Sequence, residues 1–325
     1  MTVAVIGAGP IGLELAVALK QAGIDYMQFD AGNIGSTMQW YPLEMVFHSN
    51  AERLAIAGVP IQVPDQQKIK REEFLAYLRA VVLQFDLQIR TYERVESVER
   101  TGDKFTLHTR ALDGPHVYHV DEVVLAVGAM HAPKLLGIPG EKLPHVSHYF
   151  HDPHTYFNQR LLIVGGRNSA IEAAVRCQRA GAHVTLSYRR EEFDQTTVKF
   201  WLLPEIRSMI RDERVRFLPG TYPVEIRNGS VLMNAGDEVA ADFVLALTGY
   251  HQDTTLFEML DVDLQGGDRK PRLDESTMET NVPGVFVAGT AIAGSPRERV
   301  RIIVEDCHVH VPRIVSAILK RHGRP

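Results

Sequence analysis

The chain has 325 residues, 45% of them hydrophobic, which is enough for one large or two medium-sized domains with their own cores. Its 35 basic and 40 acidic residues give a net charge of −5 and are mixed along the sequence, so neither nucleic acid nor an anionic membrane is indicated as a partner. No apolar run approaches the roughly 20 residues of a membrane span, no signal peptide precedes the first predicted strand, and two cysteines suit a reducing compartment, so we expect a cytoplasmic protein.

The chain opens with a predicted strand, helix and strand. The stretch "TVAVIGAG" has the apolar run of a buried strand, "PIGLELAVALKQAG" the pattern of a helix that ends at Gly23, and "DYMQFD" the pattern of a second strand. Two strands joined by a crossover helix form a βαβ unit, which favours a parallel sheet covered on both faces.

A glycine-rich loop joins the first strand to the helix, and Gly7, Gly9 and Gly12 fill the pattern G-x-G-x-x-G. The first glycine of this motif permits the tight turn, the second lets the backbone approach a pyrophosphate, and the third allows close packing of the helix. Asp30 ends the second strand 23 positions after Gly7, where a carboxylate can accept hydrogen bonds from ribose hydroxyls. This combination predicts a dinucleotide with an unphosphorylated ribose.

Further elements follow before the pattern repeats. The stretch 69–85 has the apolar spacing of a helix. Strands are predicted at 94–98, 105–109, 117–120 and, as a buried strand, at 121–129. Residues 131–145, "HAPKLLGIPGEKLPH", are rich in proline and glycine and have the composition of a crossing between domains.

The βαβ pattern restarts at 160–190, "RLLIVGGRNSAIEAAVRCQRAGAHVTLSYRR". Its loop is less regular, because Gly165 keeps the first glycine while Arg167 stands in the middle position and Ala170 in the third. The residues that we expect to contact a second dinucleotide here are Gly165, Gly166, Arg167, Asn168 and Ser169. Arg167 is either a cation beside the pyrophosphate or a side chain that holds the cofactor off.

The end of this second unit differs from that of the first. Twenty-three positions after Gly165 comes Tyr188 in place of an acid, and Arg189 and Arg190 follow at once. A carboxylate would repel a 2′-phosphate, whereas a guanidinium pairs with it. We therefore predict that Arg189 and Arg190 bind the 2′-phosphate of NADPH, although they could also be a solvated strand end. The first loop then holds FAD.

The C-terminal third contains three further signals. The stretch 242–253, "DFVLALTGYHQD", repeats the strand-then-glycine pattern of 121–129. The stretch 280–294, "TNVPGVFVAGTAIAG", predicts a strand followed by a glycine-containing turn, and residues 302–320 predict the last helix.

The order of these motifs, together with "LAVGA" and "TNVPGVFVAG", resembles the two-domain pyridine-nucleotide flavoproteins of the low-molecular-weight thioredoxin reductase type. The stretches "FDAGNIGSTMQWYP", "ERLAIAGVP", "HYFHDPHTYF", "VGGRNSA" and "LLPE" are most similar to the bacillithiol disulfide (bacilliredoxin) reductases within that group. The resemblance implies an α/β fold with two Rossmann-like dinucleotide-binding domains. An NADPH-binding domain (130–250) would be inserted into a discontinuous FAD-binding domain (1–129 and 251–325).

The resemblance also implies the FAD site. Residues 40–42 and Ser49 would lie near the isoalloxazine, and Gly289 with the start of the last helix would approach the ribityl and pyrimidine side. The full set of expected FAD contacts is Gly7, Gly9, Pro10, Ile11, Gly12, Asp30, Trp40, Tyr41, Pro42, Ser49, Ala126, Gly128, Gly289 and Thr290.

The chain departs from the family at three places. Thioredoxin reductases have C-x-x-C ahead of the second loop, and the matching stretch here, "HYFHD", has no cysteine. Bacillithiol disulfide reductases commonly have a cysteine in the first loop, where this chain has Ile11. Thr290 replaces the aspartate that commonly ends the last strand. The first two departures exclude a thioredoxin-type relay.

We therefore expect an NADPH-dependent, FAD-containing reductase that passes electrons from the flavin directly to a low-molecular-weight thiol disulfide such as bacillithiol disulfide. The alternatives are a flavin monooxygenase, a ferredoxin- or flavodoxin-NADP reductase, and a non-catalytic NADPH-binding redox sensor. The acceptor is a small-molecule disulfide or a small redox protein, and we expect a homo-oligomer.

Several other residues need interpretation. Cys307, in the predicted last helix, is either a buried packing residue or a redox residue beside the flavin, and it is the one candidate catalytic residue, whereas Cys177 is expected to pack. Trp201 is either core or a neighbour of the nicotinamide. Histidines recur every third residue in a stretch with two prolines, which favours a solvated loop over a metal site; they are His145, His148, His151 and His154.

Overall fold

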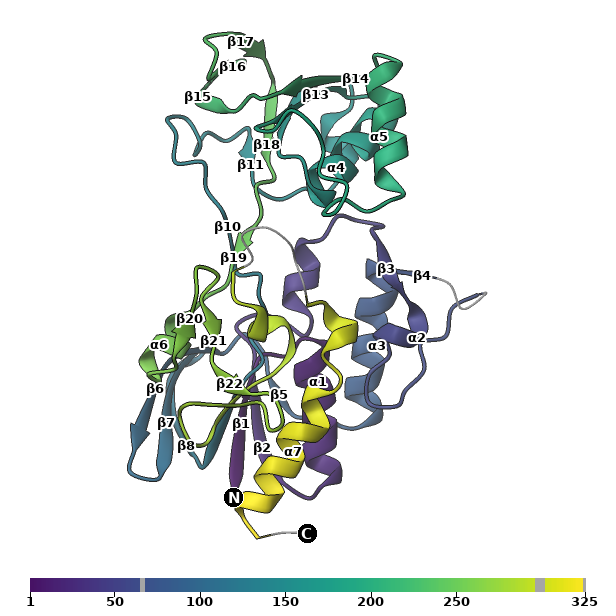
Figure 1. The fold of residues 1–325 in the computed structure, drawn as a ribbon. Helices are drawn as coiled ribbons and strands as arrows, with labels where there is room; N and C mark the ends of the chain where they lie inside the picture. The colour runs from purple at the N-terminus through teal and green to yellow at the C-terminus, as the bar shows by residue number, and fades with distance from the viewer. Residues whose placement is uncertain (65–67, 296–301, 324–325) are drawn as a thin grey trace. The chain divides into compact units, whose positions relative to one another are not determined.

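The computed structural model describes residues 1–64, 68–295 and 302–323, and the chain folds into two compact units (Figure 1). The first unit comprises residues 1–39, 44–132 and 251–325, and the second comprises residues 40–43 and 133–250. The chain passes between them at β10 (Ala132–Pro133) and β19 (Tyr250–His251), which pair as a two-stranded sheet.

A seven-stranded sheet with the order β22-β23-β24-β9-β1-β2-β5 forms the centre of the first unit. The run from β24 to β5 is parallel. In sheet order, the strands are Leu273–Asp274, Glu279–Thr280, Val285–Val287, Glu122–Leu125, Thr2–Ile6, Asp25–Phe29 and Ile89–Arg90.

Alternating side chains place different layers on the two faces of this sheet. Val3 and Val5 pack in one core cluster with the apolar sides of α1 (Pro10–Gln21) and α7 (His310–Arg321). Ala4 and Ile6 pack in another, with the antiparallel meander β6-β7-β8. The meander strands are Arg94–Thr101, Lys104–Ala111 and Gly114–Val120.

The remaining elements of the first unit are short, apart from α3 (Arg71–Gln84). They are η1 (Ser36–Trp40), which runs into the second unit, β3 (Val46–Asn50), α2 (Ala51–Leu54), β4 (Lys68–Lys70), α6 (Thr255–Met259), β20 (Leu264–Gln265), β21 (Lys270–Pro271), η4 (Gly289–Ala293) and η5 (Val304–Asp306).

The second unit repeats these three layers around a five-stranded parallel sheet. Leu161 and Ile163 pack in one cluster with α4 (Asn168–Arg179) and α5 (Leu202–Arg211). Leu162 and Val164 pack in another with the strands β15 to β17. In sheet order, the strands are β11 (Val146–Ser147), β18 (Phe243–Ala246), β12 (Arg160–Val164), β13 (His183–Tyr188) and β14 (Val215–Pro219). The other elements are β15 (Pro223–Arg227), β16 (Ser230–Met233), β17 (Glu238–Ala240) and η3 (Pro153–Tyr156).

Two predicted elements differ from the observed ones. The buried strand predicted at 121–129 ends at Leu125, because the backbone turns away and Gly128 adopts a positive φ of 71°. The last helix, predicted at 302–320, begins only at His310, after the short turn η5. Pro312 explains this start, since proline lacks an N–H and is tolerated in the first turn of a helix but not in its interior.

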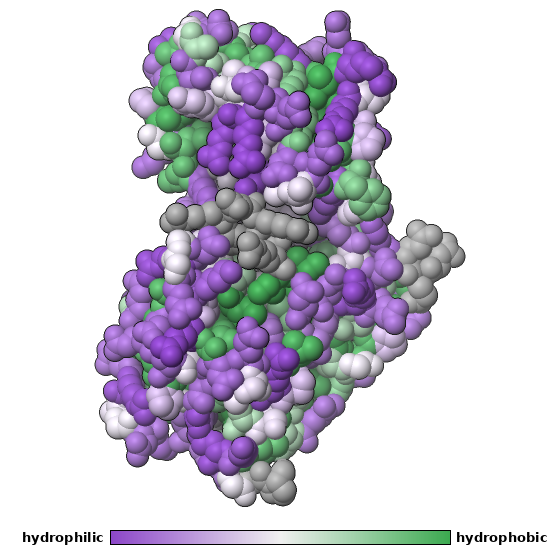
Figure 2. All heavy atoms as spheres, in the orientation of Figure 1, coloured by the Kyte–Doolittle hydropathy of each residue, from purple (hydrophilic) through white to green (hydrophobic). Residues whose placement is uncertain are grey.

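Figure 2 shows one face of the protein, on which hydrophilic residues predominate and apolar residues gather in small areas. Among the described residues, no helix is long and apolar enough to cross a membrane. The exposed large apolar side chains include Phe200, which is 78% exposed, and its neighbour Trp201.

Candidate functional site: two dinucleotide-binding loops

The first loop turns tightly between β1 and α1 because two of its glycines are sterically required. Gly7 has a φ of 117°, and a Cβ built on it would lie 2.3 Å from the carbonyl oxygen of Ala126. A Cβ on Gly12 would lie 2.2 Å from the carbonyl oxygen of Gly7. The protein's own backbone therefore excludes any side chain at the first and third positions of the motif.

Gly9 is different, because no described residue other than its chain neighbours lies within 4 Å of the position that its Cβ would take. Its φ of −75° suits any residue, and it stands as the N-cap of α1. The N–H groups of a first helical turn have no partner within the helix and attract anions. The open space at Gly9 thus lies where a pyrophosphate would approach the backbone, so these residues fit the dinucleotide that the motif predicts.

Asp30 is held in place beside this loop by the backbone. Its Oδ2 accepts the Ala8 N–H at 2.8 Å, and its Oδ1 accepts the Gly32 N–H at 2.8 Å and the Ser36 hydroxyl at 3.1 Å. These bonds fix the carboxylate at the carboxyl end of β2. A carboxylate oxygen can accept more than one hydrogen bond, so Asp30 retains capacity for ribose hydroxyls.

The sheet brings two distant segments of the predicted FAD site together. Strand β9 leads to Gly128 and β24 leads to Thr290, and the strands are parallel neighbours. The Thr290 hydroxyl accepts the Ala129 N–H at 3.2 Å. A Cβ on Gly128 would lie 3.7 Å from the same hydroxyl oxygen. Thr290, which replaces the family's aspartate, therefore joins the ends of these strands.

His310 is a residue of this region that sequence reasoning missed. The Gly289 N–H donates to His310 Nδ1 at 3.2 Å, and the imidazole is 4% exposed. Burial lowers the pKa of His310 to about 4, so the ring is neutral near pH 7 and can accept this bond. Ile11 packs on the other side of this turn, since a Cβ on Gly289 would lie 3.5 Å from the Ile11 Cβ. The start of the last helix and Gly289 are thus in contact.

The second loop repeats the hydrogen bonds of the first. Gly165 N–H donates to the Ser187 carbonyl at 3.0 Å, as Gly7 N–H donates to the Phe29 carbonyl at 2.7 Å. A Cβ on Gly165 would lie 2.6 Å from the Leu247 carbonyl oxygen, which repeats the relation of Gly7 to Ala126. Since Ser187 corresponds to Phe29, the next residue, Tyr188, corresponds to Asp30.

Arg167 occupies the place of Gly9 without backbone strain. It is the N-cap of α4 with an extended φ of −109°, which any residue adopts. Glycine is required instead at Gly166, where a Cβ would lie 2.3 Å from the Tyr188 ring. The middle position of the motif is thus free to carry a side chain here.

The residues after β13 lie at the surface. Arg189 and Arg190 are both exposed, and Arg190 forms an ion pair with Asp194 at 3.5 Å. The Asn168 side chain forms hydrogen bonds with the backbone of Thr197 and Lys199, so only the backbone N–H of Asn168 remains to bind a nucleotide. Ser169 is exposed in the same helical turn.

The residues expected near the isoalloxazine are divided between the units. Trp40, Tyr41 and Pro42 belong to the second unit, whereas Ser49 lies on β3 of the first. The Trp40 ring contacts Tyr149 edge-on, with the ring centroids 5.6 Å apart. The sequence did not indicate that Trp40 would pack with a residue more than 100 positions away.

A second aromatic contact extends this cluster. The rings of Tyr149 and Tyr250 lie 5.9 Å apart. Burial raises the pKa of Tyr250 to about 12 and also raises that of Tyr41. These phenols are therefore neutral at physiological pH.

Both cysteines are free and buried in core clusters. Burial raises the pKa of Cys177 and of Cys307 to about 12, and the Cys307 thiol donates to the Ile303 carbonyl at 3.2 Å. The thiolate is the reactive form of cysteine, and it is scarcely populated here at neutral pH. The redox role considered for Cys307 is not supported, because the thiol is fully buried among apolar side chains.

The histidine-rich stretch is only partly solvated, which corrects the expectation of a solvated loop. His148 lies 3.4 Å from the buried Glu141 and also bonds to the Ala246 carbonyl, and His145 bonds to the Arg227 carbonyl. His151 and His154 are exposed. In the part of the chain that the structure describes, no three His, Cys, Asp or Glu side chains are grouped to hold a metal ion.

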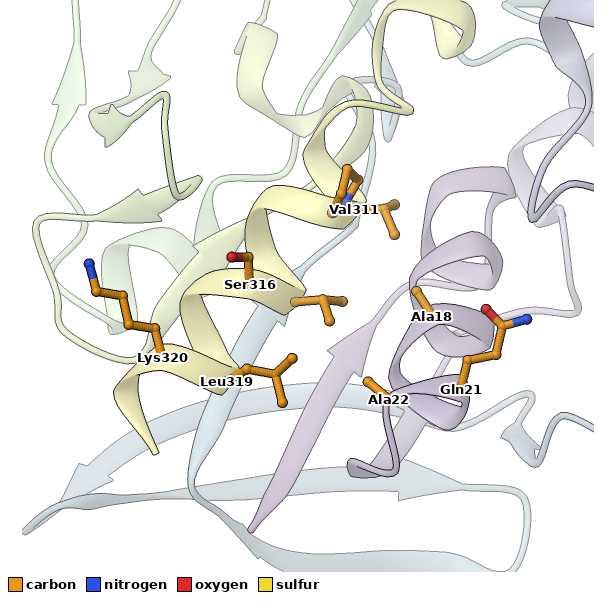
Figure 3. Close-up of a pocket in the computed structure, with 9 residues that line it drawn as sticks. Ala18, Gln21, Ala22, Val311, Ser316, Leu319 and Lys320 are labelled. Atoms are coloured by element: carbon orange, nitrogen blue, oxygen red, sulfur yellow. The ribbon is translucent and has the colours of Figure 1, made fainter. Parts of the chain in front are cut away.

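An open groove of about 700 Å³ lies between α1 and α7, and no residue of either glycine-rich loop lines it (Figure 3). The residues that line it include Ala18 and Ala22 on α1 and Val311 and Leu319 on α7. None of the residues expected to bind a cofactor lines this groove.

Comparisons with known proteins agree with this geometry. The family model described as pyridine nucleotide-disulphide oxidoreductase matches residues 4–289. Bacilliredoxin reductase Bdr of Bacillus subtilis (strain 168) is 34% identical over 324 residues, which are 98% of each protein. The solved structure of bacillithiol disulfide reductase Bdr (YpdA) from Bacillus cereus has a TM-score of 0.94 and 33% identity, over 98% of this chain and 99% of that chain. The corresponding structure from Staphylococcus aureus has a TM-score of 0.91 and 30% identity, over 99% of this chain and 98% of that chain.

Proposed function

Because the chain belongs to the pyridine nucleotide-disulphide oxidoreductase family, we propose that it is an NADPH-dependent flavoprotein that reduces a low-molecular-weight disulfide of the bacillithiol disulfide type. It is an oxidoreductase, and its family and named relatives imply FAD and NADPH as cofactors. The observation that carries the proposal is the contrast between two equivalent strand ends. One holds Asp30, and the other holds Tyr188 followed by Arg189 and Arg190.

The first loop, in this proposal, holds the ADP part of FAD. The open space at Gly9 admits the pyrophosphate to the N-terminus of α1, and the Asp30 carboxylate accepts hydrogen bonds from the ribose. Thr290 joins the ends of β9 and β24, and Gly289 is bonded to His310 at the start of α7, where the rest of the cofactor would lie. Bound FAD would supply the site that accepts a hydride from NADPH and passes two electrons onward.

The second loop holds NADPH. The N-terminus of α4 receives the pyrophosphate, and the exposed guanidinium groups of Arg189 and Arg190 bind the 2′-phosphate. Tyr188 presents no negative charge to that phosphate. The domain assignment, with FAD on 1–129 and 251–325 and NADPH on 130–250, is part of the same proposal.

Electrons leave without a protein dithiol. Cys177 and Cys307 lie in different core clusters and are both buried, so neither thiol is placed to exchange with a substrate. In the net reaction, NADPH gives a hydride, solvent gives a proton, and one S–S bond is cleaved to yield two thiols. A disulfide substrate is supported by the relatives in Bacillus and Staphylococcus, which are a bacilliredoxin reductase and two bacillithiol disulfide reductases.

The test begins with anaerobic stopped-flow reduction of the purified protein by NADPH. We expect the flavin spectrum to bleach, and we expect bacillithiol disulfide to restore it faster than ferredoxin or oxygen does. Faster reoxidation by ferredoxin would identify a ferredoxin-NADP reductase, and rapid reoxidation by oxygen would identify an oxygenase. A protein that binds NADPH but is not reduced by it would be a sensor.

A further inference from the structure

Asn168, the first residue of α4, ties a separate segment of the second unit to the N-terminus of that helix. Its side-chain Nδ2 donates to the Thr197 carbonyl at 3.3 Å, and its Oδ1 accepts the Lys199 N–H at 2.9 Å. These bonds fix the backbone of Lys199 next to the first turn of α4. That turn follows the Gly165 loop and is the anion-binding end of the helix.

The side chain of Lys199 is half-buried. Its Nζ lies 5.8 Å from the centroid of the Trp201 ring, and no ion pair involves it among the residues that the structure describes. Asp194 is the nearest acidic residue along the chain that could pair with Lys199. Its carboxylate already forms an ion pair with Arg190 and accepts hydrogen bonds from Thr196.

An unpaired ammonium group is costly to bury. Burial lowers the pKa of Lys199 to about 7, so the charged form is poorly stabilised as the protein stands. An anionic ligand at the same place would supply the missing counter-charge. Contact with the Trp201 ring alone compensates only part of the cost.

We propose that Lys199 is a nucleotide-binding residue whose ammonium group contacts the pyrophosphate of NADPH at the N-terminus of α4. The inference rests on the proposed function, since it takes the second loop as the NADPH site. The lysine ammonium group is a point charge on a flexible stem, so it can approach a pyrophosphate from a segment beside the helix N-terminus. Lys199 and the Arg189–Arg190 pair then bind different phosphates of one molecule.

Because the two sites bind different phosphates, Lys199 and Arg189 should affect the affinity for different sets of nucleotides. A residue that binds the pyrophosphate contributes equally to NADP+ and NAD+, because both contain that group. It contributes nothing to 2′-AMP, which has a 2′-phosphate but no pyrophosphate. Arg189 should show the opposite pattern, contributing to NADP+ and 2′-AMP but not to NAD+.

The test is isothermal titration calorimetry of the flavin-loaded protein with these three probes, with weak ligands measured by displacement of NADP+. The variant Lys199→Met keeps an apolar side chain beside Trp201 but removes the charge. We expect its affinity for NADP+ and for NAD+ to fall by the same factor, about tenfold to a hundredfold, which is the range for a charge-assisted hydrogen bond. Its affinity for 2′-AMP should be unchanged. Lys199→Arg should retain affinity within about threefold, because it keeps the charge.

Arg189→Ala is the matched control, and Lys199→Gln serves as a second neutral variant if the Met variant does not fold, as judged by thermal unfolding. Unchanged NADP+ affinity in the neutral variants would overturn the role of Lys199 while leaving the NADPH site intact. Loss of NADP+ and 2′-AMP with NAD+ unaffected would place Lys199 at the 2′-phosphate and would also overturn it. Failure of the unmodified protein to bind NADP+ would instead contradict the proposed function.

Discussion

The two βαβ units share one backbone design but differ in the side chains at the middle and third positions of the motif and at the strand end. Both loops turn on a glycine with a positive φ, Gly7 and Gly165, whose N–H donates to the neighbouring strand. The middle position is Gly9 in one and Arg167 in the other, and the strand end is Asp30 or Tyr188. The turn is therefore set by steric requirements of the fold, whereas in the proposed function the ligand is selected by residues at positions where the turn does not require glycine.

The third motif position shows how the two loops differ in packing. Gly12 touches the Gly7 carbonyl so closely that a Cβ would lie 2.2 Å from its oxygen. The second loop has Ala170 at the same place, fully buried, with its Cβ 2.9 Å from the position of a Cβ on Gly165. The first helix therefore approaches its turn more closely than the second.

The largest effect is expected from Gly12→Ala. The added Cβ would force α1 away from the first loop, so we expect loss of bound FAD and a decrease of about 1–3 kcal/mol in the free energy of unfolding. FAD per chain, from absorbance, and thermal unfolding measure the two effects. Ala170→Gly is the matched control and should retain FAD; retention of full FAD by Gly12→Ala would contradict the tight packing at this position.

The next prediction concerns the strand ends. Replacing Arg189 with alanine should weaken NADPH binding by about 1–3 kcal/mol while barely changing NADH binding, because only NADPH has the 2′-phosphate. KM values for both nucleotides, together with direct binding of NADP+ and NAD+, check this. Equal losses for the two nucleotides would mean that Arg189 does not bind the 2′-phosphate.

A smaller and more selective effect is expected from Gly9→Ala. Apart from Gly9 and its chain neighbours, no part of the described chain lies within 4 Å of the new Cβ, and the φ of Gly9 suits alanine, so the stability of the flavin-free protein should change by less than about 0.5 kcal/mol. FAD affinity should fall by about 1 kcal/mol or more, because the methyl group would occupy ligand space. Fluorescence titration of the flavin-free protein measures the affinity, and the released cofactor should be FAD and not FMN. Unchanged affinity would show that the space at Gly9 is not the pyrophosphate site.

The smallest effect on activity is expected from Cys307→Ser. The hydroxyl can keep the hydrogen bond to the Ile303 carbonyl, so we expect a cost of about 1 kcal/mol in stability at this buried site and nearly full disulfide reduction. The double variant with Cys177→Ser should likewise retain flavin reduction by NADPH. If Cys307→Ser abolished disulfide reduction while flavin reduction continued, Cys307 would be the relay after all.

The amino-acid sequence by itself indicated much of this arrangement. Motif spacing placed Asp30 at the strand end beside the loop of Gly7 and Gly9, and Tyr188 at the strand end beside the loop of Gly165, and the hydrogen bonds repeat in the same register. Short-range patterns are readable because a strand, a turn and the helix after it are determined by neighbouring residues. The α/β fold with its internal repeat was predicted for the same reason.

Only the tertiary structure determined which side chains are already hydrogen-bonded or buried within the protein. Asn168 is engaged with Thr197 and Lys199, His310 accepts the Gly289 N–H, and Cys307 is enclosed by apolar residues. Each of these facts depends on segments that are distant in sequence and meet only when the layers pack. Local spacing cannot reveal them, because burial and hydrogen-bond partners are properties of the assembled core and not of any one stretch of the chain.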